Sequence, residues 1–117
     1  MYSLKFTDQG LQDVRALPKN VRNALRKELL RKVRQDPAGC SRELQGPLEQ
    51  FRSFHWRDYR VVYRIFPGQR IVAIVGLGRH SPDAKIDIYR RLETAASSGK
   101  LAETILLALR GFTEGKT

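Results

Sequence analysis

The sequence predicts an α+β fold: a small antiparallel sheet, made of an N-terminal strand and a three-strand meander, with two N-terminal helices packed on one face and further helices at the C-terminus. Three observations predict it. Apolar residues recur at helical spacing over residues 18–36, strand-like runs follow over residues 48–77, and only short turns separate those runs. Helices grouped before a meander are typical of α+β domains. A chain of 117 residues is long enough for one modest core.

The first part of the chain predicts a short strand and two helices. Residues 2–6 alternate as a strand, and Thr7 or Asp8 can cap a short helix that Pro18 ends. The second helix begins at Pro18 and ends at Asp36-Pro37. Its apolar stripe is formed by Val21, Ala24, Leu25, Leu29 and Val33, and its opposite face by Arg22, Arg26, Lys27, Arg31 and Arg34.

Three strands are predicted next, over residues 48–56, 59–66 and 70–77, with Pro67-Gly68 as the second turn. Connections this short predict an antiparallel meander. The middle strand carries two arginines, Arg60 and Arg64, within an apolar run. Because strand side chains alternate, both arginines share one face, opposite Tyr59, Val61, Tyr63 and Ile65. We expect the arginine face to be partly open.

The end of the chain predicts a helix over residues 86–96, a hinge at Ser97-Ser98-Gly99 and a short amphipathic helix over residues 101–109. We expect residues 1–96 to form the main domain, and residues 97–117 a hinge, that short helix and a frayed tail. The last helix has two interpretations. It packs on its own domain, or it is a mobile helix or dimer contact that presents Leu101, Ile105, Leu109 and Phe112.

The charge is the unusual part of the composition: 22 Lys and Arg against 12 Asp and Glu, a formal +10. This excess favours a polyanionic partner such as RNA, DNA, an acidic protein or an anionic membrane surface. A single cysteine, Cys40, excludes an intrachain disulfide and a multi-cysteine metal site. The N-terminus does not resemble a signal peptide, and no apolar run is long enough to span a bilayer. We therefore expect a cytoplasmic protein without a metal or other cofactor.

Candidate functional residues gather around the arginine strand. Arg60 and Arg64 lie on it, the preceding strand adds Arg52 or His55 depending on register, and the following loop and helix start add Arg79, His80, Lys85 and Tyr89. Arg, His and Tyr side chains together suit the binding of phosphodiesters. They also suit RNA cleavage, because arginine stabilises the charged transition state and His or Tyr can move protons. The alternative is plain: an exposed arginine is most often only solvated, and His55 and His80 are more often surface histidines than catalysts.

The order of several motifs resembles the RelE/ParE superfamily, the toxins of type II toxin–antitoxin modules. These motifs are LPKNVRNALRKELLRKVRQDP, FRSFHWRDYRVVYRI, IVAIVGLGRH and DIYRRLE, within residues 2–95. Most specific is YR-x-x-Y, followed by an apolar strand, a glycine with two basic residues, and then a tyrosine. The resemblance implies a compact sheet with two N-terminal helices.

In the RelE branch, the resemblance implies an mRNA endonuclease that acts in the ribosomal A site without a metal. Arg60 then contacts the scissile phosphate. Arg79 and His80 stabilise the transition state or protonate the leaving oxygen, and Tyr89 stacks on or deprotonates the substrate. The expected RNA-binding residues are Arg52, His55, Arg64, Lys85, Arg26 and Arg31. Where that branch has two alternating lysines this sequence has RSFH, and its SPDAK loop is longer.

The resemblance also implies a cognate antitoxin, which wraps the toxin with a helix and an extended segment. A heterotetramer of the two is one assembly that it allows. An acidic antitoxin would neutralise the +10 charge. The alternative function is that of the ParE branch, which inhibits DNA gyrase and cuts no RNA. Under the nuclease hypothesis the loss of Arg60 or His80 abolishes toxicity without unfolding the protein, and under the gyrase hypothesis changes on the helices and tail matter more.

Overall fold

The computed structural model describes residues 1–83 and 85–114, with side chains described through residue 110. It confirms the α+β class. The elements in chain order are β1 (Ser3–Phe6), α1 (Asp8–Arg15), α2 (Lys19–Glu28), η1 (Leu29–Val33), β2 (Arg42–Glu43), η2 (Gly46–Leu48), β3 (Arg52–Trp56), β4 (Tyr59–Phe66), β5 (Ile71–Arg79), α3 (Ile88–Ser97) and α4 (Lys100–Glu114).

The sheet has five strands in the order β1-β5-β4-β3-β2. β3, β4 and β5 form the predicted antiparallel meander, and the two-residue β2 extends it antiparallel to β3. β1 differs from the expectation, because it pairs parallel to β5, with Ser3 opposite Ile71 and Phe6 opposite Ile74. The helices and strands between β1 and β5 provide the long crossover that a parallel pair requires.

One face of the sheet is covered by the N-terminal helices, as predicted; we call it the α1–α2 face. Thr7, of the two residues proposed, caps α1: its Oγ1 accepts from the Gly10 amide at 3.1 Å. Leu25, Leu29 and Val33 are buried against the sheet, with η1 continuing α2 as a π-helical turn. Their strand partners in this core are Phe54, Val61, Tyr63, Val72, Ile74 and Leu77.

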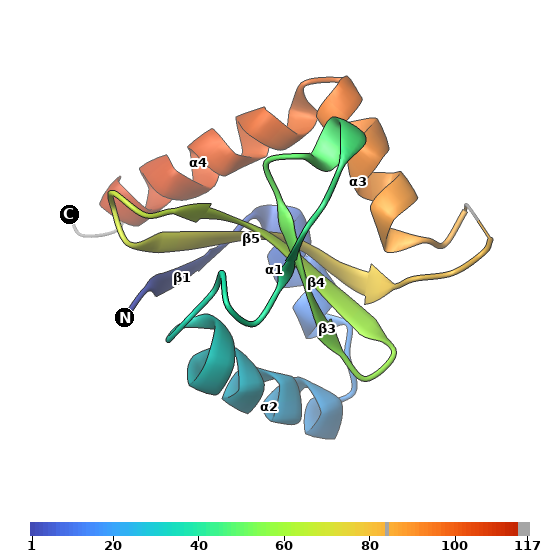
Figure 1. Ribbon diagram of the computed structural model, residues 1–117, viewed down its shortest axis with the longest axis horizontal. Helices are drawn as coiled ribbons and strands as arrows, with labels where there is room; N and C mark the ends of the chain where they lie inside the picture. The colour runs from blue at the N-terminus through green and yellow to red at the C-terminus, as the bar shows by residue number, and fades with distance from the viewer. Residues whose placement is uncertain (84, 115–117) are drawn as a thin grey trace.

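The opposite face is covered by α3 and α4, so the expectation of a partly open arginine face is wrong over most of its area. Figure 1 shows α3 and α4 on one side of the sheet and α2 on the other. A second core joins Leu92, Leu101 and Ile105 of these helices to Val62, Ala73 and Val75 of the sheet. The amphipathic pattern of residues 101–109 thus faces its own domain. We call this side the α3–α4 face.

The start of α3 lies unusually close to β5. A side-chain carbon added at Gly78 would be 3.2 Å from Cβ of Ile88, and one at Gly76 would be 3.3 Å from Ile88 Cδ1. The two glycines therefore let the helix approach the strand, in the way expected of glycine in a strand interior. This packing brings the first turn of α3 beside the end of β5, where the predicted basic loop begins.

The C-terminal helix is longer than predicted: α4 runs from Lys100 to Glu114, after a turn in which Gly99 has φ of +79°. The tail expected to fray includes Thr113 and Glu114, which are helical, and residues 115–117, which lie outside the described residues. The Phe112 side chain, assigned to the apolar stripe, also lies outside the part described. No helix in the described ranges is both long and apolar enough to cross a bilayer.

Candidate functional site

The register of β3 and β4 brings histidine and arginine together. His55 is directly opposite Arg60, and Ser53 is opposite Val62, so all four residues belong to the α3–α4 face. Near this end of the strands, α3 and α4 leave the face uncovered and two depressions open. One, of about 440 Å³, is lined by Gly39, Cys40, Ser41, Arg42, Ser53, His55 and Arg60. The other, of about 260 Å³, is lined by His55, Arg57, Asp58, Arg60, Arg79 and His80.

The two depressions share His55 and Arg60, and we call them together the cationic groove. Arg60 is half-buried, and its Nη1 donates to the carbonyl of Tyr59 at 3.2 Å. Among the side chains that the structure describes, no carboxylate forms an ion pair with this guanidinium, and no group of three or more acidic, His or Cys residues could hold a metal ion. The arginine is therefore placed to bind an anion from outside the chain.

His80 is held by a buried carboxylate, Asp87. The imidazole Nδ1 lies 2.7 Å from Asp87 Oδ1, an oxygen that also accepts from the Ser81 amide at 2.7 Å. Asp87 Oδ2 accepts from the Arg90 amide at 3.1 Å and so caps α3. Burial opposes ionisation of this carboxyl group, but its hydrogen bonds from Ser81, His80 and Arg90 outweigh burial and lower its pKa. Asp87 therefore stays an anion at neutral pH.

Tyr89 fills the space between His80 and β3. Its hydroxyl is 2.7 Å from Oγ of Ser53, which is buried in the sheet. Its ring meets the His80 imidazole edge to face, with the ring centroids 4.9 Å apart. The tyrosine predicted to belong to the site is thus next to the histidine, and it anchors the start of α3 to the strand that carries His55.

His55 is oriented by the β3–β4 turn. Its Nε2 lies 2.8 Å from the carbonyl oxygen of Arg57, which can only accept, so this nitrogen carries the hydrogen. Nδ1 is then the ring atom left with a lone pair. Arg57 itself has φ of +54°, a left-handed conformation that is unusual for a residue other than glycine, and its guanidinium lies 4.3 Å from the centroid of the Trp56 ring. The β3–β4 turn beside the groove therefore has a backbone conformation that residues other than glycine rarely adopt.

Arg79 stands at the rim of the groove rather than on its floor. It ends β5 opposite Tyr59, and its guanidinium lies over the Tyr59 ring, 5.2 Å from the centroid. An exposed ion pair of 3.9 Å joins it to Asp58. Such an exposed pair is weak and easily exchanged, so Arg79 remains available to a phosphate.

Four other predicted residues lie outside the groove. Arg52 points to the α1–α2 face and donates to Ser41 Oγ at 2.8 Å and to the carbonyls of Ala38 and Ser41. Arg64 is farther along β4, over the Phe66 ring. Lys85 lines a separate depression with Arg90 and Pro47. Arg31, on η1, pairs with Glu28 at 2.9 Å. The last predicted residue, Arg26, belongs to another surface.

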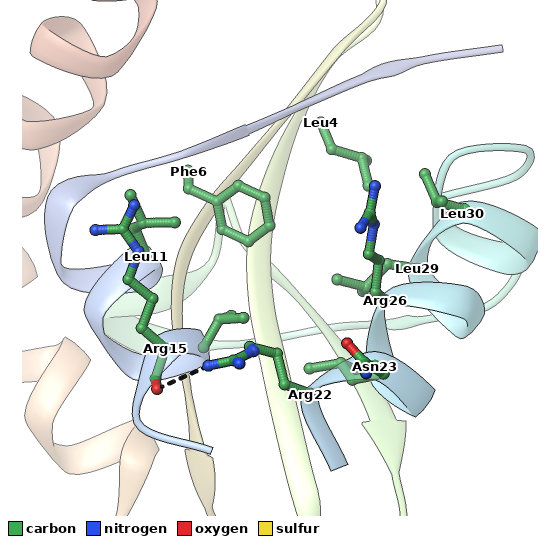
Figure 2. Close-up of a pocket in the computed structure, with 11 residues that line it drawn as sticks. Leu4, Phe6, Leu11, Arg15, Arg22, Asn23, Arg26, Leu29 and Leu30 are labelled. Atoms are coloured by element: carbon green, nitrogen blue, oxygen red, sulfur yellow. Dashed lines mark hydrogen bonds between the residues drawn. The ribbon is translucent and has the colours of Figure 1, made fainter. Parts of the chain in front are cut away.

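That surface is an apolar groove of about 700 Å³ between α1, α2 and β1. Figure 2 shows it with Arg22 reaching from α2 to the carbonyl of Arg15 at the end of α1, a hydrogen bond of 3.3 Å. Its apolar lining is Leu4, Phe6, Leu11, Val14, Leu25, Leu29 and Leu30, and its cations are Arg15, Arg22 and Arg26. An apolar floor with a cationic rim is suited to an acidic amphipathic segment.

Asp87, Ser53 and Arg42 were not predicted as site residues. Asp87 carries a signal, because an aspartate just before a helical pattern is a favoured cap. That signal concerns one oxygen of the carboxylate; the contact of the other oxygen with His80 depends on the path of the loop between β5 and α3. No sequence pattern marks Ser53 or Arg42 as a site residue. They line the groove because of the way the strands are paired, and a single sequence does not give that register.

The comparisons with known proteins agree with this architecture. The family model described as ParE toxin of type II toxin–antitoxin system, parDE, matches residues 4–84. Comparison with curated protein sequences gave no match. The chain is similar to the toxin–antitoxin complex RelBE2 of Mycobacterium tuberculosis, with 23% identity, a TM-score of 0.63 and coverage of 67% of this chain and 96% of that one.

Two further structures extend the likeness. The intact RelBE complex of E. coli is 26% identical, with a TM-score of 0.59 and coverage of 69% of this chain and 99% of that one. The YoeB/ParE toxin of Agrobacterium tumefaciens is 17% identical, with a TM-score of 0.56 and coverage of 68% and 99%. Since the family model spans most of the sequence and the fold agrees with it, the chain belongs to the ParE toxins of type II toxin–antitoxin systems, within the RelE/ParE superfamily.

Proposed function

We propose that this toxin is an endonuclease that cuts mRNA on the ribosome, with the cationic groove as its active site. The observation that carries the proposal is Arg60, a half-buried guanidinium without an ion pair in the described chain, lining the same depression as His55 and His80. A phosphate bound by Arg60 would lie in a depression that both imidazoles line. Two histidines and an arginine supply proton transfer and charge stabilisation, the requirements for cleaving RNA through its own 2′-hydroxyl.

The reaction is a transesterification at phosphorus. The 2′-oxygen forms a bond to phosphorus, and the bond from phosphorus to the 5′-oxygen of the next nucleotide breaks. The proton of the 2′-hydroxyl passes to Nδ1 of His55, the nitrogen that its hydrogen bond to Arg57 leaves free. A proton from Nε2 of a protonated His80 passes to the leaving 5′-oxygen. The products are a 2′,3′-cyclic phosphate and a 5′-hydroxyl, while Arg60 and Arg79 stabilise the added negative charge on phosphorus.

The openness of the groove and the basic charge of the α2 and η1 surface are the reasons for proposing that the toxin acts on the ribosome. The groove is open to solvent and shallow, so the chain by itself holds a flexible RNA strand weakly. A ribosome presents mRNA in a fixed path and offers ribosomal RNA to the basic outer surface of α2 and η1, which includes Lys27 and Arg31. Action on translating ribosomes also implies a cytoplasmic protein. The RelE complexes among the similar structures support this hypothesis.

Gyrase inhibition is the second candidate, and the match to the ParE family model favours it. On that hypothesis the cationic groove is not an active site, and the surfaces of α1, α2 and α4 contact the target. The two candidates differ in whether RNA is cut, so one experiment separates them.

We expect primer extension on an mRNA to show new 5′ ends within codons when purified toxin and translating ribosomes are both present. Omitting the ribosomes should remove these ends. Ends that form without ribosomes would instead identify a free ribonuclease. If protein that still arrests growth makes no cuts, the nuclease proposal is wrong, and inhibition of gyrase supercoiling should then be measured on the same preparation.

The toxin also has an antitoxin, and its binding surface is part of the proposal. The apolar groove between α1, α2 and β1 accommodates an amphipathic helix, and its Arg15, Arg22 and Arg26 select one with acidic side chains. Such a helix would cover apolar residues and neutralise part of the +10 charge. Complexes of a toxin with its antitoxin among the similar structures support an antitoxin partner for this chain. A heterotetramer of the two is the assembly we propose.

Reversing the charge of Arg26 should weaken antitoxin binding roughly tenfold, mainly by slowing association, because a like charge would then face the acidic helix. Lys27→Glu is the matched control. It makes the same change in charge at the next residue of α2, which is exposed and does not line the groove. Surface plasmon resonance with the cognate antitoxin measures both rates. Equal effects of Arg26→Glu and Lys27→Glu would place the antitoxin elsewhere.

A further inference from the structure

One buried group near the groove, Asp87, takes no direct part in the proposed reaction. Asp87 is 4% exposed, and its two oxygens accept three hydrogen bonds, from His80, Ser81 and Arg90. Capping α3 requires one oxygen, and serine or threonine would serve equally well at this position. The second oxygen, Oδ1, is not needed to cap α3. Its partners are the His80 imidazole and the Ser81 amide.

We propose that Asp87 is a positioning residue that holds His80 in the Nδ1–H tautomer and turns Nε2 toward the cationic groove. This inference rests on the proposed nuclease function. A carboxylate can only accept, so the His80 nitrogen beside it must carry a hydrogen. The other nitrogen, Nε2, is then the one that gives and takes the catalytic proton. A second partner that fixes the tautomer and orientation of a catalytic imidazole is a recurring arrangement in enzymes.

The surroundings of His80 reinforce this orientation. Tyr89 contacts the ring from α3, edge to face, and its own hydroxyl is held by Ser53 on β3. Arg60 of β4, and Arg79 and Asp58 at the rim, line the same depression as His80. The ring is thus held by an anion on its Nδ1 side and by an aromatic ring. Arg60, the cation that would bind the phosphate, lines the same depression as His80.

The role of Asp87 in capping can be separated from its role toward His80. Asp87→Ser keeps a good capping residue for α3, but its side chain is too short to reach the imidazole. Nitrogen-15 NMR of the histidine rings should report the Nδ1–H form of neutral His80 in the native protein. In Asp87→Ser it should report a shift toward the Nε2–H form, which a free imidazole prefers in water. Circular dichroism and the unfolding temperature show whether the variant keeps its fold.

Loss of the contact between Asp87 and His80 should also slow RNA cleavage. Cleavage in the ribosome assay is expected to fall on the order of 100-fold in Asp87→Ser, the loss typical of a misdirected general acid. In a His80→Gln background the same substitution should change cleavage little, because Asp87 acts through His80. A role confined to folding would instead slow both backgrounds equally.

The outcomes separate this inference from the proposed function. A native protein that makes no cuts contradicts the nuclease function, while the NMR result still decides whether Asp87 sets the His80 tautomer. An Nε2–H ring in the native protein, an unchanged tautomer in Asp87→Ser, or full cleavage by that variant would each overturn the inference. If Asp87→Ser does not fold, Asp87→Thr provides a second capping residue for the same measurements.

Discussion

Arg60→Ala is expected to reduce mRNA cleavage roughly 100- to 1,000-fold, as removal of one preorganised group that stabilises transition-state charge does in other enzymes. The guanidinium lines both depressions of the cationic groove, and its position is set by the rigid sheet: His55 is opposite it on β3 and Gly78 on β5. Removing it leaves the charge that develops on phosphorus without its central cation. The fold should be retained, since the side chain is only half-buried and donates a single hydrogen bond.

Arg64→Ala is the matched control for this prediction. It removes the same side chain four residues along the same strand and on the same face, but Arg64 lies over Phe66 and does not line the cationic groove. Primer extension on translating ribosomes, with growth arrest as a second readout, measures both variants. Arg60→Lys should retain part of the activity, because lysine keeps the charge but not the planar, two-pronged guanidinium. Equal cleavage by Arg60→Ala and Arg64→Ala would contradict the assignment of the groove as the active site.

The strands could be predicted from the sequence, and so could the side of the sheet to which each residue of β4 points. The alternation of Tyr59, Val61, Tyr63 and Ile65 correctly assigns these residues to the α1–α2 face, and Arg60 to the other. Local pattern is informative here because burial of one face specifies the phase of a strand. The position of His55 beside Arg60, rather than Arg52, followed only from the register of β3, which a single sequence leaves open.

The covering of the second face could not be predicted. The amphipathic pattern of residues 101–109 predicts that one face of this helix packs against an apolar surface. The pattern does not tell whether that surface belongs to the same chain or to a partner. The same limit applies to Asp87, whose cap was visible in the pattern while its contact with His80 was not. Direction of pairing is a further case, since the alternation within β1 is the same whether it runs parallel or antiparallel to β5.

The second large effect should be on stability. Leu101→Ala and Ile105→Ala are each expected to lower the free energy of unfolding by about 2–5 kcal/mol, the cost of removing a buried aliphatic side chain and leaving a cavity. Both side chains are almost completely buried, 4% and 3% exposed, against the sheet and α3. A domain of this size has a total stability of only about 5–15 kcal/mol, so the double variant should be largely unfolded or prone to aggregation.

Leu106→Ala and Leu107→Ala are the controls, because they shorten branched aliphatic side chains of the same size on the same helix where these are 64% and 54% exposed. They should change the free energy of unfolding by less than about 0.5 kcal/mol. Urea unfolding followed by circular dichroism measures all four variants, and an unchanged dependence on urea concentration would show that the unfolding transition itself is the same. If α4 instead spent most of its time away from the sheet, the Leu101 and Ile105 pair would become equivalent to the Leu106 and Leu107 pair. Equal, small effects in the two pairs would then show that the helix is a mobile segment and not part of the core.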